Sequence, residues 1–128
     1  MGVFLENAME IEDLQHYSDA WNAHDIDKIM SYMSDDCIFE TGGGAERWGA
    51  RIEGFDAVKT RFIEVWTELP DVAFLNERHF VQGDRGCSEW TLVATRPDGS
   101  KLEVDGCDLF TFDRGKIQVK NSLLKNRQ

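Results

Sequence analysis

The chain has 128 residues, with 14 Lys or Arg and 24 Asp or Glu, which gives a formal net charge of −10. Hydrophobic residues make up 41% and charged residues 30%, the mixture of a globular protein, which argues against disorder along the whole chain. The length predicts one domain over residues 1–128 with a single core. An acidic chain without a dense run of Lys or Arg is not expected to bind nucleic acid.

The cysteine and hydropathy patterns indicate a reduced compartment and no membrane attachment. Cys37, Cys87 and Cys107 are odd in number and have no CxxC spacing, so we expect free thiols and no zinc site. The longest apolar run, Val72 to Leu75, is too short to cross a bilayer. The N-terminus shows no basic stretch followed by an apolar one, so no leader peptide is expected. We therefore expect a cytoplasmic protein that holds no metal.

Three helices are predicted in the first half of the chain. The first runs from about Glu10 to Ala23, because its apolar residues recur at helical spacing. Asp25 is placed to cap a second helix, which ends at Asp35-Asp36. The third follows a glycine-rich loop, Thr41 to Gly54, and stops at Pro70. The apolar stripes consist of Ile11, Leu14, Tyr17 and Trp21, of Ile26, Ile29, Met30 and Met33, and of Val58, Phe62, Val65, Trp66 and Leu69.

One short strand is predicted between the second and third helices, and four longer strands follow the third helix. The predicted strands are Cys37 to Glu40, Val72 to Gln82, Cys87 to Arg96, Lys101 to Phe112 and Lys116 to Leu124. Tight turns, such as Pro97-Asp98-Gly99, join the last four and favour an antiparallel meander. The order α-α-β-α-β-β-β-β predicts an α+β fold, with the helices on one face of a curved sheet and a ligand cavity between them.

The third long strand contains one residue that its pattern does not explain. Its alternation places Leu102, Val104, Gly106, Asp108, Phe110 and Phe112 on one face. Asp108 is thus a carboxylate in an apolar row that faces inward, where it must take up a proton or find a partner. Carboxylates in such surroundings cluster at functional sites, so Asp108 is a candidate acid or base. A carboxylate with a purely structural role is the alternative.

Two aromatic side chains are further candidates for the expected interior, and one histidine lies in mid-strand with its facing undecided. Tyr17 lies on the inward stripe of the first helix, and its hydroxyl needs a partner if it is buried. Trp90 shares one face of its strand with Ser88 and Leu92. Each aromatic residue is either part of a binding-site wall or a plain core residue. His79 is expected to be a plain strand histidine, with a general base as the alternative.

The sequence resembles the nuclear transport factor 2-like superfamily, which includes ketosteroid isomerases and SnoaL-like polyketide cyclases. The most specific pieces are YSDAWNAHDIDKIMSYMSDDCIFE (Tyr17 to Glu40), the helix start at Gly54 to Phe62, and DLFTFDRGKI (Asp108 to Ile117). The resemblance covers nearly the whole chain. It implies a cystatin-like cone, with three N-terminal helices packed on a curved, mostly antiparallel sheet. It also implies a homodimer formed through the outer face of the sheet.

On this resemblance, Tyr17 and Asp108 match the pair that donates hydrogen bonds to the enolate oxygen in the isomerases. The general base of the isomerases falls on Thr41, which cannot abstract a proton from carbon at neutral pH, so steroid isomerisation is not predicted. Glu40 is adjacent but faces the other side of a regular strand. The residues expected to bind substrate in the cone are Trp21, Met33, Phe62, Trp90, Leu92, Phe110 and Lys120.

Two registers are open for the hairpin formed by the last two strands. A three-residue turn, Asp113 to Gly115, places Asp108 opposite Lys120, whereas a two-residue turn places it opposite Asn121. The apolar alternation of the last strand favours Asn121. Turn chemistry and the resemblance favour Lys120, which we take as the prediction. An ammonium beside Asp108 would hold it ionised, as a general base or as part of a plain ion pair.

These features lead to three functional hypotheses. In the first, the protein is an enzyme that acts without a cofactor on a small apolar carbonyl or polycyclic compound, by isomerisation, cyclisation or dehydration. Tyr17 then donates to the developing oxyanion, and Asp108 acts as acid or base. In the second, the same pocket binds a small ligand without reaction, as the missing base suggests. In the third, the fold serves as a protein-interaction domain.

Overall fold

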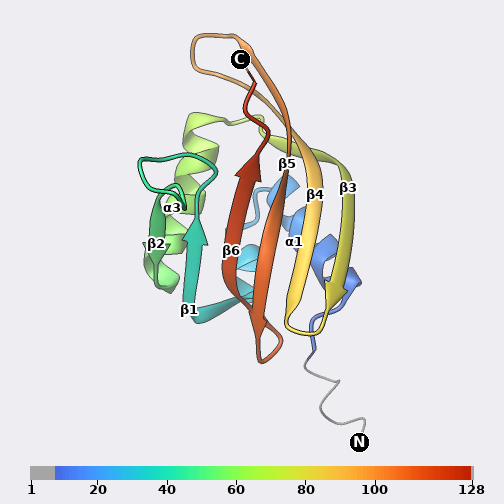
Figure 1. Cartoon of the computed structure of the whole chain (residues 1–128). Helices are drawn as coiled ribbons and strands as arrows, with labels where there is room; N and C mark the ends of the chain where they lie inside the picture. The colour runs from blue at the N-terminus through green and yellow to red at the C-terminus, as the bar shows by residue number, and fades with distance from the viewer. Residues whose placement is uncertain (1–7, 128) are drawn as a thin grey trace, which may run out of the picture.

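The chain folds into three helices that cover one face of a six-stranded sheet (Figure 1). The structure is a computed structural model and describes residues 8–127. Its elements are α1 (Ile11–Asn22), α2 (Ile26–Ser31), β1 (Met33–Glu40), β2 (Arg51–Glu53), α3 (Phe55–Glu68), β3 (Ala73–Gln82), β4 (Arg85–Thr95), β5 (Lys101–Asp113) and β6 (Lys116–Leu124). The predicted α+β class, with three N-terminal helices on a mostly antiparallel sheet, is confirmed.

The sheet has the strand order β2-β1-β6-β5-β4-β3. Strands β3 to β6 form the predicted antiparallel meander, and β1 joins it by pairing in parallel with β6. Helices α1 and α3 lie against the same face of this sheet (Figure 1). The core fills the space between them, and its most deeply buried side chains include Leu14, Tyr17, Ile29, Val58, Phe62, Phe110 and Ile117.

Two element boundaries in the first half differ from the prediction. Asp25 caps α2 as expected, because its carboxylate accepts a hydrogen bond from the Lys28 backbone nitrogen at 3.1 Å. The helix nevertheless ends at Ser31 and not at Asp35-Asp36, because Met33 already pairs with Ile117 of β6. Strand pairing thus overrides the helical spacing of Met33. The predicted glycine loop contains the short strand β2, which pairs with the end of β1.

The hairpin of β5 and β6 follows neither predicted register. The turn has two residues, Arg114 and Gly115, which both have positive φ angles (52° and 74°), as in a tight hairpin turn. One strand position later, β6 contains a bulge at Gln118, because Phe112 pairs with Ile117 but Thr111 pairs with Val119. The extra residue places Ser122 opposite Asp108 and Lys120 opposite Phe110.

The bulge also decides which side chains of β6 face the helices. Ile117 and Lys120 are both buried, although their separation of three residues would place them on opposite faces of a regular strand. Lys120 therefore shares the inner face with Asp108, as predicted, but without being its direct partner across the strands.

The outer face of the sheet carries exposed apolar side chains, among them Phe80 and Leu123. The homodimer expected through this face stays a prediction. Among the described helices, none has the length and apolar character needed to span a bilayer. The expectation about a leader peptide also stays a prediction, because residues 1–7 of the N-terminus lie outside the described range.

Candidate active site

A cavity of about 240 Å³ lies between the helices and the inner face of the sheet. It is smaller than the ~300–1,000 Å³ of most drug-sized binding sites, so it suits a compact ligand. Its wall is mainly apolar, and among residues 8–127 it contains one carboxylate and two cationic groups. The lining residues are Trp21, Phe39, Thr41, Gly42, Gly43, Arg61, Val65, Phe74, Trp90, Leu92, Asp108, Lys120, Ser122 and Leu124.

Asp108 lies at the inner end of this cavity with only 5% of its surface exposed. Its Oδ2 accepts hydrogen bonds from Lys120 Nζ at 3.2 Å and from Trp90 Nε1 at 3.1 Å. Its Oδ1 accepts one from Ser122 Oγ at 2.5 Å. A carboxylate has about four acceptor positions, so three are occupied and one remains for a ligand or a proton. In all three hydrogen bonds Asp108 is the acceptor, and the donor role that the resemblance implied stays a prediction.

Lys120 is the buried cation of the site, with 5% of its surface exposed. Its ammonium lies 4.9 Å from the ring centroids of both Tyr17 and Trp21, and 5.5 Å and 5.9 Å from those of Phe62 and Phe110. These rings stabilise the charge through cation–π contacts.

The charge state of Lys120 follows from its neighbours. Burial lowers the pKa of Lys120, but the charge of the nearby Asp108 carboxylate opposes this effect, and the pKa is raised above its ordinary value. The side chain is therefore an ammonium at neutral pH. It is a hydrogen-bond donor that carries a positive charge, not a general base.

Two further donors lie beside Lys120 and lack a strong acceptor. In the described part of the chain, the Tyr17 hydroxyl donates only to Met33 Sδ, at 3.6 Å, and a thioether is a weak acceptor. Burial raises the pKa of Tyr17 against a smaller opposing effect of Lys120, so the phenol stays protonated. Within residues 8–127, Trp21 Nε1 has no acceptor in good hydrogen-bond geometry, and its nearest one is the Tyr17 oxygen, where weak donation from Trp21 and Lys120 partly offsets the rise in the pKa of Tyr17.

These donors surround a second, very small void of about 10 Å³. That is close to the smallest space that holds one water molecule, and therefore one oxygen atom. Tyr17, Trp21 and Lys120 contribute donors to its wall, and Asp108 contributes a carboxylate. The remaining lining residues are Ser18, Phe74 and Trp90. An oxygen atom there would lie among the donors of Tyr17, Trp21 and Lys120, although Lys120 also donates to the Asp108 carboxylate in the same wall.

The predicted substrate-binding residues divide into two groups. Trp21, Trp90, Leu92 and Lys120 line the 240 Å³ cavity, whereas Met33, Phe62 and Phe110 lie in the core and line neither space. Tyr17 and Asp108, the predicted catalytic pair, both border the smaller void. Contact between these residues and a substrate stays a prediction.

Sequence reasoning did not place eight of the lining residues in the cavity: Phe39, Gly42, Gly43, Arg61, Val65, Phe74, Ser122 and Leu124. Ser122 was not foreseen because its facing depends on the bulge, and Phe74 because no pattern separated it from the core. Arg61 had a usable signal, since it lies one helical turn before Val65 on α3 and both residues line the cavity.

The first strand supplies no base to the cavity. Thr41 lines it, as the resemblance implied, but its hydroxyl is held within the loop, donating to the Gly43 carbonyl at 2.6 Å and accepting from the Ala50 nitrogen at 2.9 Å. Glu40 lies outside the cavity and forms an ion pair with Arg51 at 2.7 Å, in agreement with its expected facing. Asp108 is thus the single carboxylate in the described lining.

His79 plays no part in either space. Its Nδ1 is 2.7 Å from Ser88 Oγ, and its Nε2 is 3.0 Å from Gln15 Oε1. Burial lowers the pKa of His79 against the opposing effect of Glu77, so the ring is neutral at pH 7. These contacts agree with the plain strand histidine that the sequence suggested.

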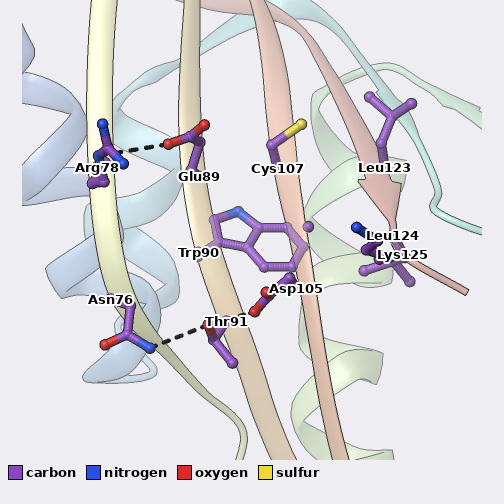
Figure 2. A pocket seen from close by; sticks show the side chains of 11 residues that line it. Asn76, Arg78, Glu89, Trp90, Thr91, Asp105, Cys107, Leu123, Leu124 and Lys125 are labelled. Carbon is purple, nitrogen blue, oxygen red and sulfur yellow. Dashed lines mark hydrogen bonds and ion pairs between the residues drawn. The ribbon is translucent and has the colours of Figure 1, made fainter. Parts of the chain in front are cut away.

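A larger groove of about 760 Å³ lies on the outer face of the sheet (Figure 2). Its polar side chains interact with one another. Arg78 is 3.7 Å from Glu89, and Thr91 accepts a hydrogen bond from Asn76 at 3.2 Å and donates one to Asp105 at 2.7 Å (Figure 2). Because these groups already have partners near solvent, the inner cavity is the better candidate for chemistry.

The family model of the SnoaL-like domain matches residues 14–119. No curated protein matches the sequence. Among solved structures, a provisionally assigned polyketide cyclase from Xanthomonas campestris pv. campestris is 16% identical, with a TM-score of 0.79, over 89% of this chain and 88% of its own. An NTF2-like protein of unknown function from Mesorhizobium loti is 26% identical, with a TM-score of 0.74. The match covers 90% of this chain and 89% of the Mesorhizobium chain.

A second provisionally assigned polyketide cyclase, from Pseudomonas putida, is 18% identical, with a TM-score of 0.77, over 93% of this chain and 92% of its own. These likenesses agree with the cone of helices on a curved sheet that the sequence implied, and the family model covers most of the chain. The chain therefore belongs to the SnoaL-like domain family.

Proposed function

We propose that this protein is a small-molecule enzyme that moves a proton on a compact, largely apolar carbonyl compound by stabilising its enolate. The observation that carries the proposal is the one-oxygen void bordered by Lys120, Tyr17 and Trp21. Donors aimed at a developing oxyanion in a water-poor site supply the largest single contribution to many reactions of this kind. The name polyketide cyclase, carried by structural neighbours, is compatible with such chemistry but comes from the fold alone.

The roles of the side chains follow from their charges. The carbonyl oxygen of the substrate would enter the void and accept hydrogen bonds from the Lys120 ammonium and the Tyr17 hydroxyl. The Asp108 carboxylate would take a proton from the carbon next to the carbonyl, and the bonding electrons would move to the oxygen. Where a neighbouring double bond extends the enolate, return of that proton from Asp108 to the far carbon completes an isomerisation. Where the enolate attacks an internal carbonyl, the new alkoxide takes the proton from Asp108 and completes a cyclisation.

The apolar wall would hold the body of the substrate. Trp21, Trp90, Phe74 and Leu92 line the cavity and offer flat or branched surfaces to a ring system. Excluding water there strengthens the electrostatic interactions at the void.

Exchange of α-protons tests this proposal directly. 2-Tetralone is incubated with the protein in deuterated buffer, and loss of the α-proton signal is followed by proton NMR. The wild type should accelerate exchange, and Lys120→Met should lower the acceleration by about 10²-fold or more, the usual effect of removing an oxyanion donor. Lys125→Met, which removes an exposed lysine outside the cavity, is the matched control and should leave the rate unchanged. Exchange in the wild type no faster than in buffer would contradict the proposal.

A binding protein without catalysis is the second candidate, and one observation favours it. Asp108 already accepts hydrogen bonds from Lys120, Trp90 and Ser122, so it has little capacity left for a proton. On this alternative, 2-tetralone or a related compound binds and is recovered with its α-protons unexchanged after long incubation.

A further inference from the structure

Arg61 gives the cavity a second cation, and among residues 8–127 its charge has no buried partner. It lies on α3 one turn before Val65, and both side chains line the cavity that contains Lys120. The Arg61 side chain is 33% exposed, whereas the Lys120 side chain is 6% exposed, so Arg61 lies toward the solvent side and Lys120 at depth.

The one ion pair that Arg61 makes within residues 8–127 is weak. Its Nη1 lies 3.7 Å from Glu64 Oε2, and the Glu64 side chain is 56% exposed. Exposed pairs of this kind contribute little, so the guanidinium can exchange Glu64 for another anion at small cost.

The charges along the cavity differ in sign from those of the protein as a whole. Lys120 and Asp108 neutralise each other at 3.2 Å, so the charged groups of the lining, Arg61, Lys120 and Asp108, sum to +1. The whole chain carries −10. A positive cavity favours an anionic ligand even in a protein that is acidic as a whole.

We propose that the ligand of this cavity is a small aryl keto or enol acid, whose carboxylate pairs with Arg61 while its carbonyl or enol oxygen lies beside Lys120. This inference rests on the proposed function for the role of Lys120, and adds the class of substrate. An arginine suits this role because its planar fork binds a carboxylate through two parallel hydrogen bonds. Binding at two points also fixes the reacting carbon relative to Asp108.

Two probes that differ by one carboxylate test the proposal. 2-Naphthol carries only the oxygen meant for Lys120, and 6-hydroxy-2-naphthoate adds a carboxylate at the far end of the ring system. Their affinities are measured by isothermal titration calorimetry at one ionic strength. The variants are Arg61→Gln, Arg61→Lys and Lys120→Met, each checked for folding by circular dichroism.

Arg78→Gln is the matched control. Arg78 also has a glutamate partner at 3.7 Å, Glu89, but it lies on the outer face of the sheet and is 84% exposed. Arg78→Gln removes the same charge and a similar ion pair but changes no residue that lines the cavity.

The wild type should bind 6-hydroxy-2-naphthoate roughly tenfold or more tightly than 2-naphthol, as expected for one charge-assisted pair. This preference should vanish in Arg61→Gln, persist in part in Arg61→Lys and remain intact in Arg78→Gln. Equal affinity for both probes, or a preference that survives in Arg61→Gln, would overturn the role of Arg61. In that case, loss of 2-naphthol binding in Lys120→Met would still support the proposed function. Failure of the wild type to bind either probe would overturn both.

Discussion

The buried ion pair of Lys120 and Asp108 is the feature whose removal should have the clearest energetic effect. The two charged atoms are 3.2 Å apart, and both side chains are almost fully buried. At an effective dielectric constant of about 20, two unit charges at this distance attract each other by about 5 kcal/mol. Much of this attraction offsets the cost of burying the charges, so the pair as a whole contributes far less to stability.

When one partner is removed, the cost of burying the other charge is no longer offset. Lys120→Met leaves the Asp108 carboxylate in an apolar wall with hydrogen bonds from Trp90 and Ser122 only. Asp108→Asn leaves the ammonium with its aromatic contacts alone. We expect each substitution to lower the free energy of unfolding by about 3–5 kcal/mol, the usual penalty for an unpaired buried charge.

The double variant Lys120→Met/Asp108→Asn decides whether the pair acts as a unit. Because the double variant removes both charges, its loss in free energy of unfolding should be smaller than the sum of the two single losses by about 2 kcal/mol or more. The measurement is urea unfolding at pH 7, followed by far-ultraviolet circular dichroism for all four proteins. Single effects that simply add would refute the reasoning, since they would mean that the two charges do not interact in the folded protein.

Three further predictions concern the same site. Tyr17→Phe should change the free energy of unfolding by less than about 1 kcal/mol, because in the described part of the chain the hydroxyl donates only to the weak acceptor Met33 Sδ. The same substitution should slow the α-proton exchange. A large loss of stability would instead show that the hydroxyl has a structural role. The pKa values of Tyr17 and Lys120 are both raised, the first by burial and the second by the Asp108 charge, which outweighs burial, so the unfolded chain releases these protons first. Stability should therefore be constant with respect to these groups up to about pH 10 and fall above it, more steeply in the wild type than in Lys120→Met, as urea titrations at several pH values would reveal. Gly106→Ala would place a methyl group 2.7 Å from Trp90 Cζ3 and against a backbone carbonyl, so thermal unfolding should show a loss of about 1–3 kcal/mol; unchanged stability would contradict this packing.

The sequence predicted those parts of the site that depend on simple periodicity. Alternation along the predicted strand placed Asp108 on the inner face, and helical spacing placed Tyr17 and Trp21 on the inward side of α1, as observed. Both patterns are properties of one element, and the hydrophobic core enforces them.

The contact between Lys120 and Asp108 was predicted for an incorrect reason. The turn of two residues alone would have placed Asn121 opposite Asp108, and the bulge at Gln118 then moved Lys120 to the inner face. A bulge inserts one residue at a place that no composition marks, so periodicity cannot locate it.

Other differences have the same origin in tertiary pairing. Strand β2 lies in a glycine-rich stretch with poor strand propensity, and pairing with β1 stabilises it. The early end of α2 likewise depends on the parallel partner that β6 offers to Met33. Parallel pairing joins segments far apart in the sequence, and local patterns carry no signal for it.

The acidity of a bound phenol tests the central claim most directly. 4-Nitrophenol changes its absorption spectrum when it ionises, so its pKa can be titrated in the presence of saturating protein. If Lys120 and Tyr17 stabilise an oxyanion in the small void, the bound phenol should be roughly tenfold or more acidic than the free compound, and Lys120→Met should remove this effect. A bound phenol that is as acidic as the free compound, or less acidic, would contradict the account.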